Sequence, residues 1–210
     1  NNDEPTFENT ILAYDNAGQM LAQTELIFGM LCAAETNERM QALQEQVMPL
    51  LSAHRDKIRL DEKLFARVKD VYDRRASLGL DAEQSRLLRK TYDAFVRSGA
   101  LLDAGQKARL KEINGELSLT AVKFGNNILA ENNNFALELT ADDLEGLPSG
   151  VRDAAREKAQ AMGKGDKWVF TLHKPSLIPF LTYSAKRDLR EKIYKAYLNR
   201  CNNGDQYDNK

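Results

Sequence analysis

The sequence predicts a mainly α-helical fold, made of long antiparallel helical hairpins with one small two-stranded β element. Apolar residues recur every three or four positions along most of the chain, which is the spacing of one face of a helix. Residues that commonly cap helices stand directly before several of these stripes. Only two short segments, 135–139 and 168–172, are strand candidates.

The first third of the chain predicts two helices. The first opens at Thr6, after Pro5, and its stripe is Phe7, Ile11, Tyr14, Gly18 and Leu21. The run 26–32 is apolar on all sides, which indicates a helix buried within a larger body, with Cys32 as a small buried side chain. A second helix starts at 36–38, and Pro49 is expected to kink or split it.

Capping residues define the next three helices. Asp61 is predicted to cap the third helix, and Gly79 to end it in a left-handed conformation. Asp81 is followed by an acidic and amide first turn, which favours the start of the fourth helix, with Gly99 at its end. Asp103 is predicted to cap the longest helix, which the asparagine run 132–134 breaks.

Mixed structure is predicted after that break. Segment 135–139 is expected to pair in an antiparallel manner with 168–172, because a lone short strand cannot satisfy its own backbone. Short helices are expected at 141–147, 151–162, 175–184 and 185–199, with a turn at 163–166. The sequence therefore predicts a long-helix hairpin region, 1–132, and a mixed helix and short-strand region, 133–210.

Composition excludes several classes of protein. The 210 residues are 42% hydrophobic and 29% charged, with a net charge of −1. This balance predicts no nucleic acid partner and no anionic membrane partner, and no segment has the roughly 18 consecutive apolar residues of a membrane span. The two cysteines, Cys32 and Cys201, are no disulfide framework. We expect a cytoplasmic protein, with a periplasmic one left open because the N-terminus reads as trimmed.

No catalytic, cofactor-binding or metal-binding residue is predicted. The two histidines, His54 and His173, are far apart, and the zinc signature H-E-x-x-H is absent; a surface role is favoured for His54 and a structural or surface role for His173. The glycines at 163 and 165 lack the surroundings of a phosphate loop and read as a turn. Ser149 and Ser176 have no plausible partners for nucleophilic catalysis.

An ordered series of segments nevertheless resembles the peptidyl-dipeptidases of the thimet oligopeptidase family. The first is Phe7-Glu8-Asn9-Thr10-Ile11, similar to an opening common in these proteins. Further similar segments are 64–68, 74–81, 95–102, 154–159, 167–168, 190–194 and 208–209. No single segment is diagnostic, but together they cover essentially the whole chain.

The resemblance implies a zinc metallopeptidase built from long helices around a deep channel, which removes dipeptides from the C-termini of short unfolded peptides. Its zinc ligands and general base match no position here, so the chain reads as an N-terminal part, cut short before the zinc catalytic domain. This part would form one wall of the channel, with the missing C-terminal catalytic domain as its partner. Alone it is expected to bind no zinc, to cleave nothing and to expose an apolar surface.

Two alternatives to this interpretation stay open. One is a free-standing helical protein-interaction module that uses an exposed apolar face. The other is a hydrolase with an unrecognised site in this chain. A reading frame that continues into H-E-x-x-H favours the peptidase and excludes the interaction module.

Overall fold

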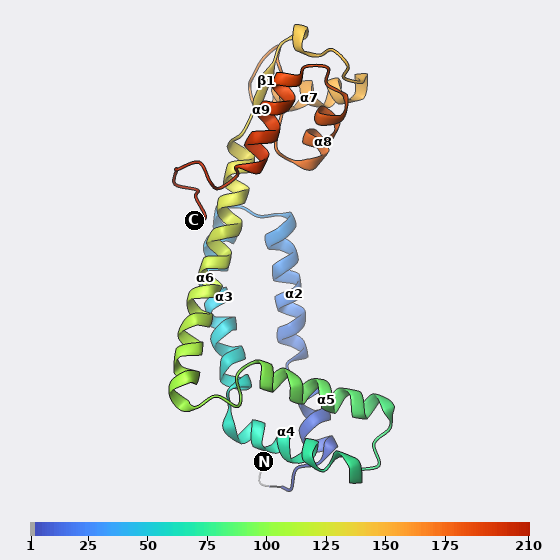
Figure 1. Cartoon of the computed structure of the whole chain (residues 1–210), viewed down its shortest axis with the longest axis vertical. Helices are drawn as coiled ribbons and strands as arrows, with labels where there is room; N and C mark the ends of the chain where they lie inside the picture. The colour runs from blue at the N-terminus through green and yellow to red at the C-terminus, as the bar shows by residue number, and fades with distance from the viewer. Residues whose placement is uncertain (1–2) are drawn as a thin grey trace. The chain divides into compact units, whose positions relative to one another are not determined.

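The computed structural model describes residues 3–210 and is mainly α-helical, as predicted, with a two-stranded antiparallel sheet among these residues (Figure 1). None of the described helices is both long and apolar enough to cross a membrane. In chain order the elements are η1 Phe7–Leu12, α1 Ala13–Asp15, α2 Gln19–Ala34, α3 Glu38–Arg59, α4 Glu62–Asp73, η2 Arg75–Ser77, α5 Ala82–Arg97, α6 Ala104–Asn134, β1 Leu137–Leu139, η3 Ala141–Asp143, α7 Ser149–Ala161, β2 Trp168–Phe170, α8 Lys174–Tyr183 and α9 Arg187–Leu198.

Contacts along the chain divide it into two compact units, with the division after Val122, inside α6. We call the part up to Val122 unit 1 and the part from Lys123 unit 2, and describe each by itself. The expected domains, 1–132 and 133–210, stay a prediction, and the first two residues of that range lie outside the described residues.

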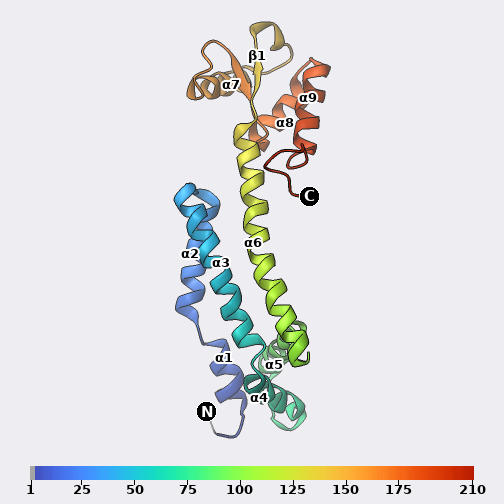
Figure 2. The same cartoon turned by 90° about the vertical axis from the view of Figure 1, so that its left-hand side faces the viewer.

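The core of unit 1 lies where α4, α5 and the N-terminal turn η1 meet (Figure 2). Phe65 and Phe95 stack with ring centroids 6.1 Å apart, and Tyr72 and Tyr92 stack at 3.9 Å. The buried residues of this core are Phe7, Ile11, Phe65, Val68, Val71, Leu88, Phe95 and Ala100. The predicted stripes of these helices therefore face one another.

The predicted caps are present. The side chains of Asp61 and Asp81 accept hydrogen bonds from the backbone amides of Leu64 and Gln84, at 2.7 and 2.8 Å. Asp103 Oδ1 accepts from the amide of Gln106 in the same way, at 2.8 Å. Each cap satisfies an amide that the first turn of a helix leaves without an intrahelical partner.

One expectation about the first helices was wrong, and of the kink or split expected at Pro49 only the split is contradicted, while the kink stays a prediction. The first stripe is not one helix, because Gly18 adopts a left-handed conformation with φ of 75° and separates α1 from α2. Pro49 does not split the second helix, since α3 runs from Glu38 to Arg59. A proline removes only one amide donor from such a helix, and the remaining hydrogen bonds of 22 residues keep the chain helical.

Helix α2 was expected to be buried, and none of its residues is buried among the described residues. Cys32, expected to be buried with it, is half-buried. Cys201, which follows a polar stretch of sequence, is buried instead. Its amide donates to the carboxylate of Glu131, which lies 70 residues earlier in the chain. An apolar sequence indicates that a helix is stabilised by burial, but it does not indicate which polypeptide packs against that helix.

Unit 2 has a second core between the sheet and helices α7, α8 and α9. Strands β1 and β2 are antiparallel, as predicted, with Glu138 opposite Val169. The buried residues are Leu137, Leu139, Leu144, Leu147, Ala155, Phe170, Leu172, Leu177, Phe180 and Ile193. The helix expected at 141–147 is only the short turn η3, in which Asp143 and Thr140 form a capping box. This local bonding replaces a longer helix.

The outer face of the sheet contains a carboxylate held by two lysines. Glu138 pairs with Lys164 at 2.8 Å and with Lys167, and hydrogen bonds from these lysines lower the pKa of the Glu138 carboxyl to about 2. Since the folded-state pKa lies below the unfolded one, the pairing stabilises unit 2 above pH about 4.5 and is lost as the pH falls towards 2.

We therefore expect Glu138→Gln to be less stable than the parent chain at pH 6 and equal to it near pH 2. Urea unfolding followed by Trp168 fluorescence across this pH range measures the difference. Glu157→Gln, at an exposed position on α7, is the control and is expected to show no such pH dependence. A difference between the Glu138→Gln and parent chains that is constant with pH would contradict the assignment.

Candidate functional site

The described residues do not form a metal site. His54 lies on α3 and His173 directly before α8, and both are exposed, as expected for surface residues. Among residues 3–210, no three or more His, Cys, Asp or Glu side chains are grouped so that they could hold a metal ion. The residues described therefore do not fit the zinc ion that the resemblance implies.

Two serines and both cysteines have hydrogen bonds or pKa shifts that do not favour a role as nucleophile. Ser52 Oγ donates to the Asn114 carbonyl at 3.4 Å, and Ser176 Oγ accepts from the amide of Thr171 at 3.0 Å. Burial raises the pKa of the Cys32 thiol and, together with a hydrogen bond to Glu131, that of the Cys201 thiol. A raised pKa suppresses the reactive thiolate, so these groups read as structural.

The first segment that carries the resemblance, Phe7 to Ile11, packs against the core of unit 1. Thr6 and Asn9 form a capping box, in which the Thr6 side chain accepts from the Asn9 amide at 3.1 Å. Thr10 is buried beside it, while Phe7 and Ile11 enter the core. This segment therefore forms a capped helical turn with two buried apolar side chains, Phe7 and Ile11, which is a structural role.

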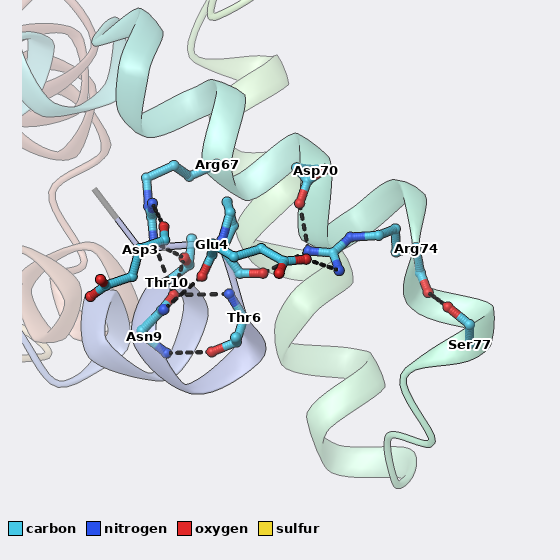
Figure 3. A network of polar contacts seen from close by, with 10 residues as sticks. Asp3, Glu4, Thr6, Asn9, Thr10, Arg67, Asp70, Arg74 and Ser77 are labelled. Atoms are coloured by element: carbon cyan, nitrogen blue, oxygen red, sulfur yellow. Dashed lines mark hydrogen bonds and ion pairs between the residues drawn. The ribbon is translucent and has the colours of Figure 1, made fainter. Parts of the chain in front are cut away.

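Two arginines of the α4 region hold this N-terminal segment (Figure 3). Arg67 donates to the Asp3 carbonyl at 2.7 Å, to Asn9 Oδ1 at 3.0 Å and to Thr10 Oγ1 at 3.2 Å. Arg74 donates to the Pro5 carbonyl at 2.6 Å and pairs with Asp70 at 2.6 Å. Guanidinium groups suit this role because several fixed donors serve acceptors from two segments at once.

We expect Arg67→Ala to destabilise unit 1 by about 1–3 kcal/mol, because several hydrogen bonds to a charged donor are lost and their acceptors are left half-buried. Lys69→Ala is the control: its ion pair with Asp73 is exposed, and such pairs contribute about 0–1 kcal/mol. Chemical unfolding followed by circular dichroism measures both. Equal effects of the two variants would contradict the anchoring role of Arg67.

The other resembling segments of unit 1 are also turns and core positions. Gly79 and Gly99 have φ of 64° and 94°, and a side chain at Gly99 would lie 2.7 Å from Leu110 Cδ2. Asp81 is the cap of α5, and Phe95 is fully buried. The residues that carry the resemblance in unit 1 therefore build the scaffold.

In unit 1, helix α3 contacts the part of α6 up to Val122, and two open hollows are lined by residues of both helices. Asn114 Nδ2 donates to Asp56 Oδ1 at 2.8 Å and joins the helices there. One hollow, of about 790 Å³, is lined in part by Pro49, Asp61 and Lys111, and the other, of about 810 Å³, in part by Tyr14, Arg59 and Leu117.

Polar and apolar side chains together line these two hollows. This surface offers hydrogen-bond donors and acceptors beside apolar side chains, an arrangement that suits contact with a ligand. No motif in the sequence predicted this surface. A weak signal existed in the polar residues one turn apart, Ser52 with Asp56 on α3 and Asn114 with Ser118 on α6.

Comparison with known proteins confirms the resemblance. The chain is 35% identical over 205 residues to dipeptidyl carboxypeptidase of Escherichia coli K12, and 35% identical over 207 residues to the dipeptidyl carboxypeptidase of Salmonella typhimurium LT2. It is 26% identical over 209 residues to oligopeptidase A of the same Salmonella strain. These matches cover 94–97% of the chain but only about 30% of the length of the relatives. No family model matches the chain.

Proposed function

This chain is a relative of the dipeptidyl carboxypeptidases and oligopeptidases A, and we propose that it is a non-catalytic part of a zinc-dependent peptidase that removes dipeptides from the C-termini of short peptides. The observation that carries the proposal is the 35% identity over 97% of the chain to a dipeptidyl carboxypeptidase three times as long. The missing part of such a peptidase supplies the zinc ligands and the general base.

The role of this part is to form one wall of the substrate channel. Long helices suit such a wall, because α3 and α6 present side chains along 22 and 31 residues without interrupting the backbone. The hollows beside their contact provide donors, acceptors and apolar surface for an extended peptide. A narrow channel admits unfolded peptides, excludes folded proteins and keeps bulk water from the reacting groups.

The scaffold character of the resembling residues supports this division of labour. In unit 1 they cap helices, turn the chain and fill the core, as Asp81, Gly99 and Phe95 do. These residues determine the shape of unit 1, and a shape is what a channel wall contributes to catalysis.

The reading frame that encodes the chain tests the proposal. We expect it to continue into an H-E-x-x-H segment, and we expect the purified full product to contain one zinc ion per polypeptide by elemental analysis. A reading frame that ends near Lys210, or zinc held tightly by residues 1–210 alone, would overturn it.

A second candidate is a free-standing helical interaction module. The exposed apolar side chains of α2 favour it, since a partner protein could cover them. A reading frame confined to these residues, with a stable complex of the 210-residue chain and a different protein, would select this candidate over the peptidase.

A further inference from the structure

Helix α2 meets the rest of unit 1 through one narrow stripe. Glu25, Phe28 and Cys32 are its half-buried residues, and they recur at spacings of three and four. Glu25 pairs with Arg55 of α3. The described part of α2 is otherwise exposed, although most of its residues are apolar.

The opposite side of α2 is apolar and uncovered. Leu26, Ile27 and Met30 are 65%, 59% and 63% exposed, and Leu31 extends the same surface. A helix of 16 residues is marginally stable in water without such a face packed against something. Contiguous exposed apolar surfaces of this kind mark sites of contact with another polypeptide or a membrane.

The charges around α2 exclude two of the possible occupants. Residues 16–45 contain four glutamates and a single basic residue, Arg39, and α2 itself has no lysine or arginine. Helices that lie on membranes need basic residues beside their apolar face, so a lipid surface does not fit. The apolar side of α2 itself carries no charge, but Glu35 directly after α2 and Glu38 and Glu45 on α3 are exposed, and the like charges of these glutamates disfavour a second copy docked along α2.

We propose that this side of α2 is the docking surface for a helix of the same polypeptide that lies outside residues 1–210, and that this helix has an apolar stripe flanked by lysine or arginine. The inference rests on the proposed function. The relatives are about three times as long as the matched chain, so a relative of full length has further polypeptide that could supply this helix. The charge argument is that Glu35, Glu38 and Glu45 are exposed and form no ion pair with a described residue.

Photocrosslinking in the complete polypeptide tests the proposal. A photoreactive benzoylphenylalanine in place of Met30 is expected to crosslink within one molecule to a residue beyond Lys210, beside a lysine or arginine, as mapped by mass spectrometry. The same probe in place of Lys90, exposed on α5, gives the background. Crosslinks only to a second copy, to lipid in added phosphatidylglycerol vesicles or to residues within 1–210 would overturn the proposal.

A charge variant of the 210-residue chain tests the surface independently. The double variant Leu26→Glu, Met30→Glu is expected to lose most of the fluorescence of a dye that binds exposed apolar surface, with an unchanged thermal unfolding curve. The matched control is Ile178→Glu on α8, which is 54% exposed and lies in unit 2. Unchanged dye binding in the double variant would show that this side of α2 is not a free apolar surface.

The failure of this proposal can be told from failure of the proposed function. A complete polypeptide that releases dipeptides but places the Met30 probe against solvent would overturn the docking surface alone. A polypeptide that gives the expected crosslink but releases no dipeptide would overturn the peptidase function alone.

Discussion

Phe95→Ala is expected to destabilise unit 1 by about 3–5 kcal/mol, the cost of removing a large aromatic side chain from a core. Phe95 is fully buried, and its ring lies 5.5 Å from that of Tyr14 and 6.1 Å from that of Phe65. The guanidinium of Arg59 lies 5.1 Å from the same ring. One truncation therefore removes contacts that join α1, α3, α4 and α5.

Two spectroscopic signals show whether the loss of stability in Phe95→Ala is confined to unit 1. Its single tryptophan, Trp168, lies in unit 2, so tryptophan fluorescence reports on unit 2, whereas circular dichroism reports on all helices. We expect Phe95→Ala to lower the urea midpoint of part of the circular dichroism signal and to leave the fluorescence transition in place. Phe124→Ala, at a position 50% exposed, is the control. A cost below about 1 kcal/mol for Phe95→Ala would contradict the core described for unit 1.

Gly146→Ala is expected to destabilise unit 2 by about 2–3 kcal/mol. Gly146 has φ of 83°, which L side chains rarely adopt, and an added Cβ would lie 2.3 Å from the Tyr183 carbonyl oxygen and 3.0 Å from the Ala185 amide nitrogen. Both neighbours are backbone atoms, and the Ala185 amide already donates to the Glu145 carbonyl at 2.9 Å. The connection from α8 to α9 must therefore shift.

A second glycine, Gly163, separates the cost of the left-handed conformation from the cost of the contact with backbone atoms. Gly163 has φ of 66° but has open space around the position of a Cβ, so Gly163→Ala carries only the conformational cost, about 1–2 kcal/mol. Urea unfolding followed by Trp168 fluorescence compares them. Equal costs at the two glycines would show that the close approach of Gly146 to the Tyr183 carbonyl is not real.

Local signals in the sequence predicted much of the fold. Asp61, Asp81 and Asp103 cap helices because their carboxylates reach amides three residues on, a geometry that depends on no distant part of the chain. Gly79 was predicted as left-handed for a similar local reason. The strand pair was predicted because each of two short strands needs a partner.

Features set by distant contacts could not be predicted in this way. Cys201 is buried where its amide donates to Glu131, far away in sequence, and Thr10 accepts a hydrogen bond from Arg67 of α4. The apolar character of α2 was visible, but its exposure was not, since periodicity does not identify the covering polypeptide. The hollows beside α3 and α6 arise from the packing of two helices and have no sequence motif.

The central claim is that these residues shape a peptidase but do not catalyse. Its most direct test is the release of dipeptides from a short peptide with a free C-terminus, measured by mass spectrometry. We expect no release by the purified 210-residue chain, and release by the complete polypeptide that stops when a chelator removes zinc. Cleavage by the 210-residue chain alone, insensitive to the chelator, would contradict the claim.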